Sequence, residues 1–329
     1  MAKYVIYYII LILAAVGTIA FFVNRSVKFG NKYSKDIINE VSVDTSMPCP
    51  DLKGYQSMYA VVPDNTELNA KQFENDTYAT LLVDTDKHIP LVAHNALRRI
   101  YPASTTKLMT GILVCEALNK GELSLDDEVL LDHEIDFSDP EALVSPLTIG
   151  STITVRSLLY GLMMRSYNDF AVILAEVVGG DQATFCEMMN NKAYQIGATA
   201  CHFANPHGLH DDNHYVTAYD MYLILNEAKK YDILKEIDSY SSFTYSYTDE
   251  DGNVWEDDIS PTNMFLAGEY KTPSNITIHE WKTGTTDAGG YILTMNVEID
   301  HGNYCLFVAD KNSPDDLYDK IGNLFNYTK

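Results

Sequence analysis

Apolar residues recur with two different periods along the chain, and each period predicts a different kind of element. Residues 78–83 and 89–94 are strand-like segments around a polar stretch at 84–87, which predicts two strands joined by a turn. From residue 104 to residue 118, apolar side chains recur every third or fourth position, which predicts a helix. The folded part of the chain is therefore expected to begin with a hairpin and continue into a helix.

A helical middle and a strand-rich end follow. Three segments are predicted as helices: 154–165, 169–178 and 182–196. Three late segments are predicted as strands before a closing helix at 314–324: 276–283, 290–299 and 304–310. Strands on both sides of a helical insert predict one α+β domain, in which helices flank an antiparallel sheet built from segments far apart in the chain.

The first segment of the chain predicts a membrane anchor. Residues 4–23 contain no charged side chain and are about as long as a helix that spans a bilayer. A cleavable signal peptide has a shorter apolar region, so residues 1–23 are predicted to be an uncleaved transmembrane signal-anchor. Residues 24–74 are polar and interrupted by prolines, which predicts a tether before a folded domain at 75–329.

Charge and cysteine content exclude some classes of function. The 23 basic and 46 acidic residues give a net charge of −23, which argues against a nucleic-acid partner. The five cysteines are scattered and contain no C-x-x-C pair, so neither a zinc ribbon nor a redox motif is predicted. Four basic residues follow the apolar segment and one precedes it, which by the positive-inside rule alone would place the domain in the cytoplasm.

Ser104 and Lys107 are the first candidates for chemistry. Residues three apart on a helix share a face, so the Lys107 amine reaches the Ser104 hydroxyl. A serine hydroxyl needs an adjacent base to act as a nucleophile, and a lysine serves as that base when burial or nearby cations lower its pKa. Two further patterns follow in order and could converge on the same site: Ser166-Tyr167-Asn168 in a predicted loop and Lys282-Thr283-Gly284 on a predicted strand.

These patterns, with the longer blocks at 101–110, 157–169, 203–209 and 282–289, resemble the low-molecular-mass penicillin-binding proteins, the serine D-alanyl-D-alanine carboxypeptidases. The resemblance runs from about residue 78 to the C-terminus and implies the fold of β-lactamases and penicillin-binding transpeptidases. It also implies a peptidoglycan stem peptide as substrate, β-lactams as inhibitors, and no cofactor or metal. A substrate in the wall overrules the charge count and places the domain outside the cytoplasm, on the single-pass anchor predicted from residues 1–23.

The resemblance implies a role for each matching residue. Ser104 would form the acyl-enzyme with Lys107 as its base, and Ser166 would relay a proton to the departing D-alanine. Asn168 would hold the substrate amide, and Lys282 would orient Ser166 and supply positive potential. Thr283 and Thr285 of the third block would bind the terminal carboxylate beside Gly284. The backbone amides of Ser104 and Thr285 would form the oxyanion hole.

Two residues depart from the family pattern. Tyr167 stands where a small residue is common, and its bulk would narrow the site. Glu280 precedes Lys282 by two positions, so it would either disturb the local field or point away from the site.

Four alternatives remain. A β-lactamase or a D,D-endopeptidase would use the same fold, and a non-catalytic wall-binding module would keep it without the chemistry. A metal site is the fourth, because six potential ligands lie within 13 positions: His202, His207, His210, Asp211, Asp212 and His214.

Overall fold

The computed structural model describes residues 59–63, 67–73, 77–137, 139–140 and 142–328. The predicted membrane segment at 4–23 lies outside these residues. Within them, no helix combines the length and the apolar character that crossing a membrane requires.

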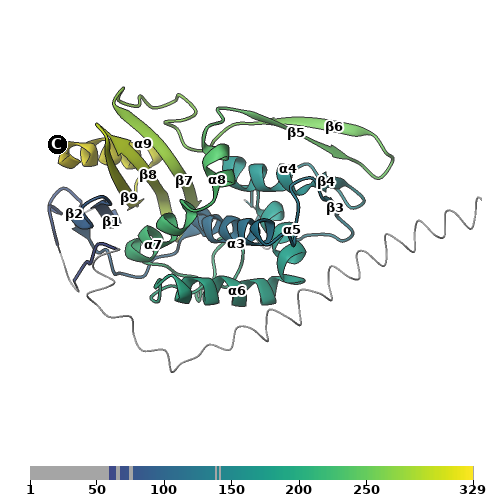
Figure 1. The fold of residues 1–329 in the computed structure, drawn as a ribbon, viewed down its shortest axis with the longest axis horizontal. Coiled ribbons are helices and arrows are strands. Elements are labelled where there is room, and N and C mark those ends of the chain that lie inside the picture. Colours follow the sequence, from purple (N-terminus) through teal and green to yellow (C-terminus); the bar gives the residue numbers. More distant parts are fainter. Residues whose placement is uncertain (1–58, 64–66, 74–76, 138, 141, 329) are drawn as a thin grey trace, which may run out of the picture.

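A five-stranded antiparallel sheet joins the two ends of the described chain (Figure 1). Its strand order is β2-β1-β9-β8-β7. The strands are β1 (Thr77–Asp84), β2 (Ile89–His94), β7 (Ile276–Thr286), β8 (Gly290–Ile299) and β9 (Gly302–Asp310). The first strand therefore pairs with the last, in register from Ala79 opposite Ala309 to Asp84 opposite Tyr304. The prediction of a sheet assembled from distant segments is confirmed.

Both faces of this sheet are covered, because successive side chains along each strand point to opposite sides. On β9, Leu306 and Val308 pack toward α9 (Pro314–Leu324), whereas Cys305 and Phe307 pack toward the other helices. Helix α9 begins where the predicted closing helix does, with Pro314 as its first residue after a Ser313 N-cap.

The helical part lies on the other side of the sheet, around α3 (Lys107–Asn119), which runs through its centre (Figure 1). Nearly every residue of α3 is buried, which is the pattern of a helix surrounded by protein. Five helices pack near it: α4 (Val155–Tyr160), α5 (Asn168–Gly179), α6 (Gln182–Gln195), α7 (Ala218–Ala228) and α8 (Asp232–Asp238). Helices α7 and α8 were not predicted from the sequence.

A second, four-stranded sheet lies beyond α4, with the order β3-β4-β5-β6. Its strands are β3 (Glu128–Leu130), β4 (Thr152–Thr154), β5 (Phe243–Thr248) and β6 (Val254–Ile259). The acidic run at 248–252 forms the turn between β5 and β6, because the Asp249 carboxylate accepts hydrogen bonds from Asn253 and Trp255.

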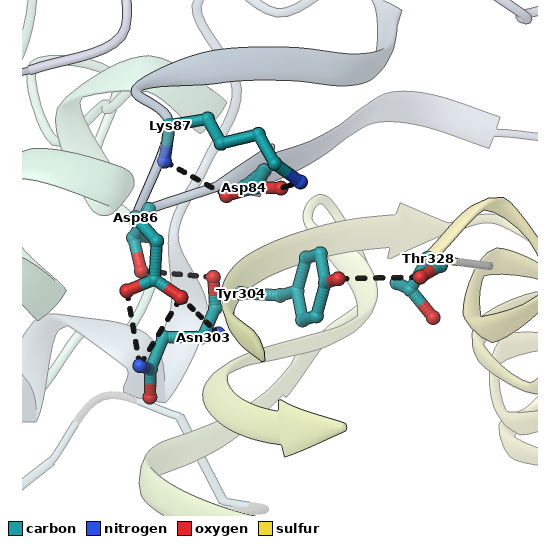
Figure 2. Close-up of polar contacts among 7 residues, drawn as sticks. Asp84, Asp86, Lys87, Asn303, Tyr304 and Thr328 are labelled. Atoms are coloured by element: carbon teal, nitrogen blue, oxygen red, sulfur yellow. Dashed lines mark hydrogen bonds and ion pairs between the residues drawn. The ribbon is translucent and has the colours of Figure 1, made fainter. Parts of the chain in front are cut away.

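Polar contacts tie the β1–β2 turn to β9 and β9 to the C-terminal residues (Figure 2). The Asp86 carboxylate accepts hydrogen bonds from the backbone N–H of Asn303 at 2.8 Å and from its side-chain amide at 3.0 Å. These bonds hold the pKa of Asp86 below its ordinary value. The Tyr304 hydroxyl donates to the carbonyl of Thr328 at 3.2 Å.

Residues upstream of the predicted domain start also pack on the domain. Ala60 is fully buried, its N–H donates to the Tyr222 hydroxyl at 3.1 Å, and its carbonyl accepts from the Tyr219 hydroxyl at 2.7 Å. Leu68 pairs with Ala93 of β2 through backbone hydrogen bonds. The predicted tether at 24–74 thus contains segments that contact the domain.

Candidate active site

Ser104 lies on a single 3₁₀ turn, Ala103–Thr106, that leads directly into α3. The predicted helix therefore becomes α-helical only at Lys107, one turn later than the sequence pattern indicated. Ala103 has φ of +48°, a left-handed conformation that non-glycine residues adopt at an energetic cost. Burial of Ala103, Thr105 and Thr106 holds this strained turn in place.

The Lys107 amine has three hydrogen-bond partners. Its Nζ lies 2.9 Å from Ser104 Oγ, 2.8 Å from Asn168 Oδ1 and 2.7 Å from the carbonyl oxygen of His207. The last two atoms can only accept, so a neutral amine spends both of its N–H groups on them. Its remaining lone pair then faces the Ser104 hydroxyl.

Burial favours that neutral amine. Lys107 is completely buried, and its pKa lies well below the ordinary lysine value, chiefly because burial disfavours the cation. The charge of Lys282 lowers this pKa further, whereas Asp169 opposes the shift. The arrangement therefore provides a hydroxyl beside a base that is neutral at lower pH than a free lysine.

The second motif follows an irregular helix end. The predicted helix over 154–165 is α-helical from a Thr154 N-cap to Tyr160 and closes with a π turn, Gly161–Arg165. Ser166 then adopts the left-handed conformation, with φ of 70° and ψ of 29°. Its hydroxyl is buried and has no hydrogen-bond partner among the described residues. An unpartnered buried hydroxyl in a strained conformation is typical of a functional site.

Asp169 supports this motif, and the sequence reasoning gave it no role. Its carboxylate accepts hydrogen bonds from the backbone N–H and the hydroxyl of Ser145. The N–H of Asn168 donates to the carbonyl of Leu143, so the loop around 143–145 is fixed against the start of α5. Burial nevertheless raises the pKa of Asp169. The only feature of the sequence that pointed to a role for Asp169 was its position directly after Asn168.

Strand β7 brings the third motif against the Ser104 turn. A Cβ built on Gly284 would lie 3.0 Å from the Ser104 nitrogen and 3.1 Å from the Pro102 carbonyl oxygen, which is tighter than most Cβ contacts, so glycine favours this close approach of β7 to the turn. Thr285, next along the strand, is exposed.

Lys282 is completely buried, and burial lowers its pKa to about 7. Its Nζ donates to the Thr283 carbonyl at 3.2 Å, and the Thr283 hydroxyl lies 2.5 Å from that of Thr262. Across the described chain, no hydrogen bond joins Lys282 to Ser166, although the family resemblance implies that Lys282 orients Ser166.

The two residues that depart from the family pattern both point into the protein. Tyr167 is buried with its ring 5.1 Å from that of Phe170, and its hydroxyl lies 3.4 Å from Asp257 on β6. Glu280 occupies an irregular position of β7 and accepts a hydrogen bond from Asn296 at 2.9 Å. Burial and the charge of Glu280 together raise the pKa of Asp238 well above its ordinary value.

The histidine-rich segment lines the base side of the site. His207 supplies its carbonyl to Lys107, and both ring nitrogens of His214 are engaged, one with Thr106 and the other with two backbone N–H groups. Over the residues that the structure describes, no three His, Cys, Asp or Glu side chains gather as a metal site would require.

The D-alanyl-D-alanine carboxypeptidase family (peptidase S11) matches residues 66–312 of this chain. The D-alanyl-D-alanine carboxypeptidase DacF of Bacillus subtilis is 28% identical over 258 residues, which cover 78% of this chain and 63% of that protein. The D-alanyl-D-alanine carboxypeptidase DacC of Escherichia coli is 31% identical over 227 residues, covering 67% of this chain and 53% of that protein. The chain thus spans between half and two thirds of the length of these curated relatives.

Solved structures share the fold. Penicillin-binding protein D2 of Listeria monocytogenes, in its cefotaxime-bound form, superposes with a TM-score of 0.64 at 25% identity, covering 76% of this chain and 96% of that one. A variant of the Streptomyces K15 DD-transpeptidase gives a TM-score of 0.66 at 24% identity, with the same coverage. The predicted penicillin-binding transpeptidase-like α+β fold is confirmed.

Proposed function

Because this chain belongs to the D-alanyl-D-alanine carboxypeptidase family of serine peptidases, we propose that it removes the terminal D-alanine from peptidoglycan stem peptides through an acyl-enzyme on Ser104. The observation that carries the proposal is the setting of the Lys107 amine. Two fixed acceptors, Asn168 Oδ1 and the His207 carbonyl, direct its lone pair to the Ser104 hydroxyl.

Acylation begins with a proton transfer from Ser104 Oγ to Lys107 Nζ. The Ser104 oxygen attacks the carbonyl carbon of the penultimate D-alanine, and the carbonyl oxygen becomes an oxyanion. The backbone N–H groups of Ser104 and Thr285 stabilise that charge, and the close approach of Gly284 to the Ser104 nitrogen supports this pairing of the turn with β7.

Expulsion of D-alanine completes acylation. The C–N bond breaks, and the departing amine takes up the proton first accepted by Lys107, relayed by Ser166, whose hydroxyl has no other partner among the described residues. Thr283 and Thr285 bind the substrate's terminal carboxylate, and Lys282 supplies the positive potential that attracts it. Asn168 holds the substrate's peptide amide. Water then cleaves the Ser104 ester and releases the shortened peptide.

The proposal extends to location. Residues 1–23 serve as an uncleaved membrane anchor, residues 24–74 connect it to the domain, and the domain at 75–329 lies outside the cytoplasm. A stem peptide in the wall is accessible only from there. A protease is added to cells whose wall has been removed and whose membrane is unbroken. Cleavage of the domain supports this orientation, and complete resistance of the domain in these cells, together with its cleavage after lysis, overturns it.

Labelling with a fluorescent penicillin tests the acyl-enzyme. β-Lactams mimic the D-alanyl-D-alanine end, so wild-type protein is expected to be labelled and Ser104→Ala to remain unlabelled. Ser274→Ala, a substitution at an exposed position of the loop before β7, is the matched control and is expected to label normally. Equal labelling of wild type and Ser104→Ala contradicts the proposal.

A second candidate is a D,D-endopeptidase. The D-alanyl-D-alanine endopeptidase of Escherichia coli is 28% identical over 253 residues, which cover 76% of both chains. Digestion of purified monomeric and cross-linked muropeptides separates the two reactions. Release of D-alanine from the pentapeptide monomer supports the carboxypeptidase, whereas conversion of cross-linked dimers alone supports the endopeptidase. Rapid, repeated hydrolysis of the penicillin label would instead indicate a β-lactamase.

A further inference from the structure

His214 is a buried histidine outside the three motifs. It lies in the segment before α7, is 1% exposed, and packs its ring edge-on against Phe203 at 5.7 Å. Its Nδ1 lies 3.0 Å from the backbone nitrogen of Ala204 and 3.3 Å from that of Asn205. Both backbone groups can only donate, so Nδ1 is the accepting nitrogen and the ring proton resides on Nε2.

The second ring nitrogen contacts the Ser104 turn. His214 Nε2 lies 2.7 Å from Thr106 Oγ1, which in turn lies 2.8 Å from the carbonyl oxygen of Ala103. A carbonyl only accepts, so the Thr106 hydroxyl donates to Ala103 and accepts from His214. The backbone N–H groups at one end of this series of hydrogen bonds and the Ala103 carbonyl at the other therefore fix which atom donates in each bond. This assignment requires a neutral His214.

We propose that His214 is a positioning residue for the acylation of Ser104, a proposal that rests on the function above. Its Nε2–H fixes the Thr106 hydroxyl, which holds the Ala103 carbonyl in the left-handed conformation that directly precedes Ser104. Thr106 is the last residue of the turn and links Ser104 to Lys107, the first residue of α3. Movement of Thr106 therefore changes the separation of the nucleophile and its base.

The 203–214 segment also binds the Lys107 amine and packs against the Ser104 turn. The His207 carbonyl accepts from Lys107 at 2.7 Å, and the Pro206 carbonyl accepts from the Thr110 hydroxyl at 2.6 Å. Gly208 touches the carbonyl of Ala103. His214 thus joins the 203–214 segment and the Ser104 turn into one unit, which gives the family block at 203–209 a physical role.

Charge at His214 would break this arrangement, because protonated Nδ1 would donate toward two N–H groups. Burial lowers the pKa of His214 to about 3, and the charges of His202, Lys107 and His210 lower it too, against the opposing effect of Asp211. The ring therefore stays neutral through the pH range in which wall enzymes act.

Acylation kinetics with a fluorescent penicillin test the proposal, because they separate initial binding from bond formation. His214→Ala and Thr106→Val are each expected to lower the acylation rate constant about 100-fold, the effect of misplacing reacting groups by about 1 Å. The constant for initial binding should change less than about 3-fold. The double variant should be no slower than the slower single variant, since both break one chain of hydrogen bonds.

His214→Gln provides a rescue, since its amide offers one acceptor and one donor. It should recover at least about 10-fold of the rate lost in His214→Ala. Asn190→Ala is the matched control, because Asn190 bonds the N–H and carbonyl of Phe203 and so holds the same segment without touching the turn. This variant should lose thermal stability while keeping its acylation rate.

Three outcomes overturn the positioning role: a folded His214→Ala with a wild-type acylation rate, losses that multiply in the double variant, or an equal rate loss in Asn190→Ala. If His214→Ala does not fold, Thr106→Val and His214→Gln decide by the same criteria. Absence of labelling in wild type rejects the proposed function, whereas normal labelling with an insensitive His214 rejects only this inference.

Discussion

Lys107 and Lys282 are both completely buried, and the charge of Lys282 lowers the pKa of Lys107. The proposed reaction needs opposite states of the two amines. Lys107 must be neutral to accept the Ser104 proton, whereas Lys282 must be charged to attract the substrate carboxylate. The pair therefore limits activity from both ends of the pH range.

We predict a bell-shaped dependence of kcat/KM on pH. The rising limb follows the lowered pKa of Lys107, and the falling limb begins near pH 7, because the pKa of Lys282 is lowered to about 7 and its charge is lost above that value. Lys282→Arg keeps a cation at high pH and is expected to move the falling limb upward by more than about one unit. Rates on a D-alanyl-D-alanine peptide measure both profiles. An unshifted falling limb in an active Lys282→Arg variant contradicts this assignment.

A second prediction concerns Asp169. Its charge raises the pKa of Lys107, so Asp169→Asn is expected to lower that pKa and to move the rising limb toward lower pH. The variant should also lose stability, because the carboxylate accepts bonds from Ser145. Ser145→Ala is the control, since it loosens the same loop but leaves the charge in place. If the rising limb moves equally in Asp169→Asn and Ser145→Ala, the shift comes from the loosened loop and not from the lost charge of Asp169.

Gly208 provides a third prediction. A Cβ on this residue would lie 1.9 Å from the Ala103 carbonyl oxygen, and its φ is +91°. Gly208→Ala is therefore expected to displace the Ser104 turn and to lower penicillin labelling at least about 100-fold.

Gly121→Ala is the matched control for Gly208→Ala. Gly121 also has a positive φ, of +68°, but nothing lies within 4 Å of the added Cβ. Its substitution should cost about 1 kcal/mol of stability and leave labelling unchanged. Similar labelling by the two glycine variants would show that the close approach is not required.

The fourth prediction separates stability from activity at Ser166. Ser166→Gly removes both the left-handed strain and an unpartnered buried hydroxyl, so Tm should rise by about 2–4 °C. Acylation should fall about 100-fold or more, because the proton relay is lost. Ser166→Ala retains the strain and should lose activity without the full gain in Tm. Calorimetry and penicillin labelling measure the two effects. A destabilised or fully active Ser166→Gly would show that the strained conformation of Ser166 is not kept for activity at a cost in stability.

Much of the fold was predictable because its strands and outer helices carry clear periods. Strands β2 and β8 and helix α9 begin and end at the predicted residues. Helices α7 and α8 and the two strands of the β5–β6 hairpin were missed. The strands of that hairpin expose many polar side chains, including Thr244, Glu256 and Asp258, so they show little of the apolar alternation that marks a strand.

The site was less predictable, because backbone atoms make much of it. The sequence indicated that Ser104 and Lys107 share a face, but the His207 carbonyl carries no side-chain signal. The left-handed conformation of Ser166 depends on a π turn, which no helical period distinguishes from an α-helical end. His214 was considered only as a metal ligand, since its hydrogen bonds to distant backbone and to Thr106 appear only in three dimensions.

The pairing of β1 with β9 also governs when the protein can finish folding. Contacts between residues 77–84 and 304–310 require the chain to close a loop of more than 200 residues, which is a slow and late step. A chain interrupted during synthesis between residues 286 and 302 has its motifs at 104, 166 and 282, yet it lacks the strand that joins β1 to β8. Premature termination is therefore expected to give an inactive, aggregation-prone fragment with unpaired strand edges, even though every proposed catalytic residue has already been made.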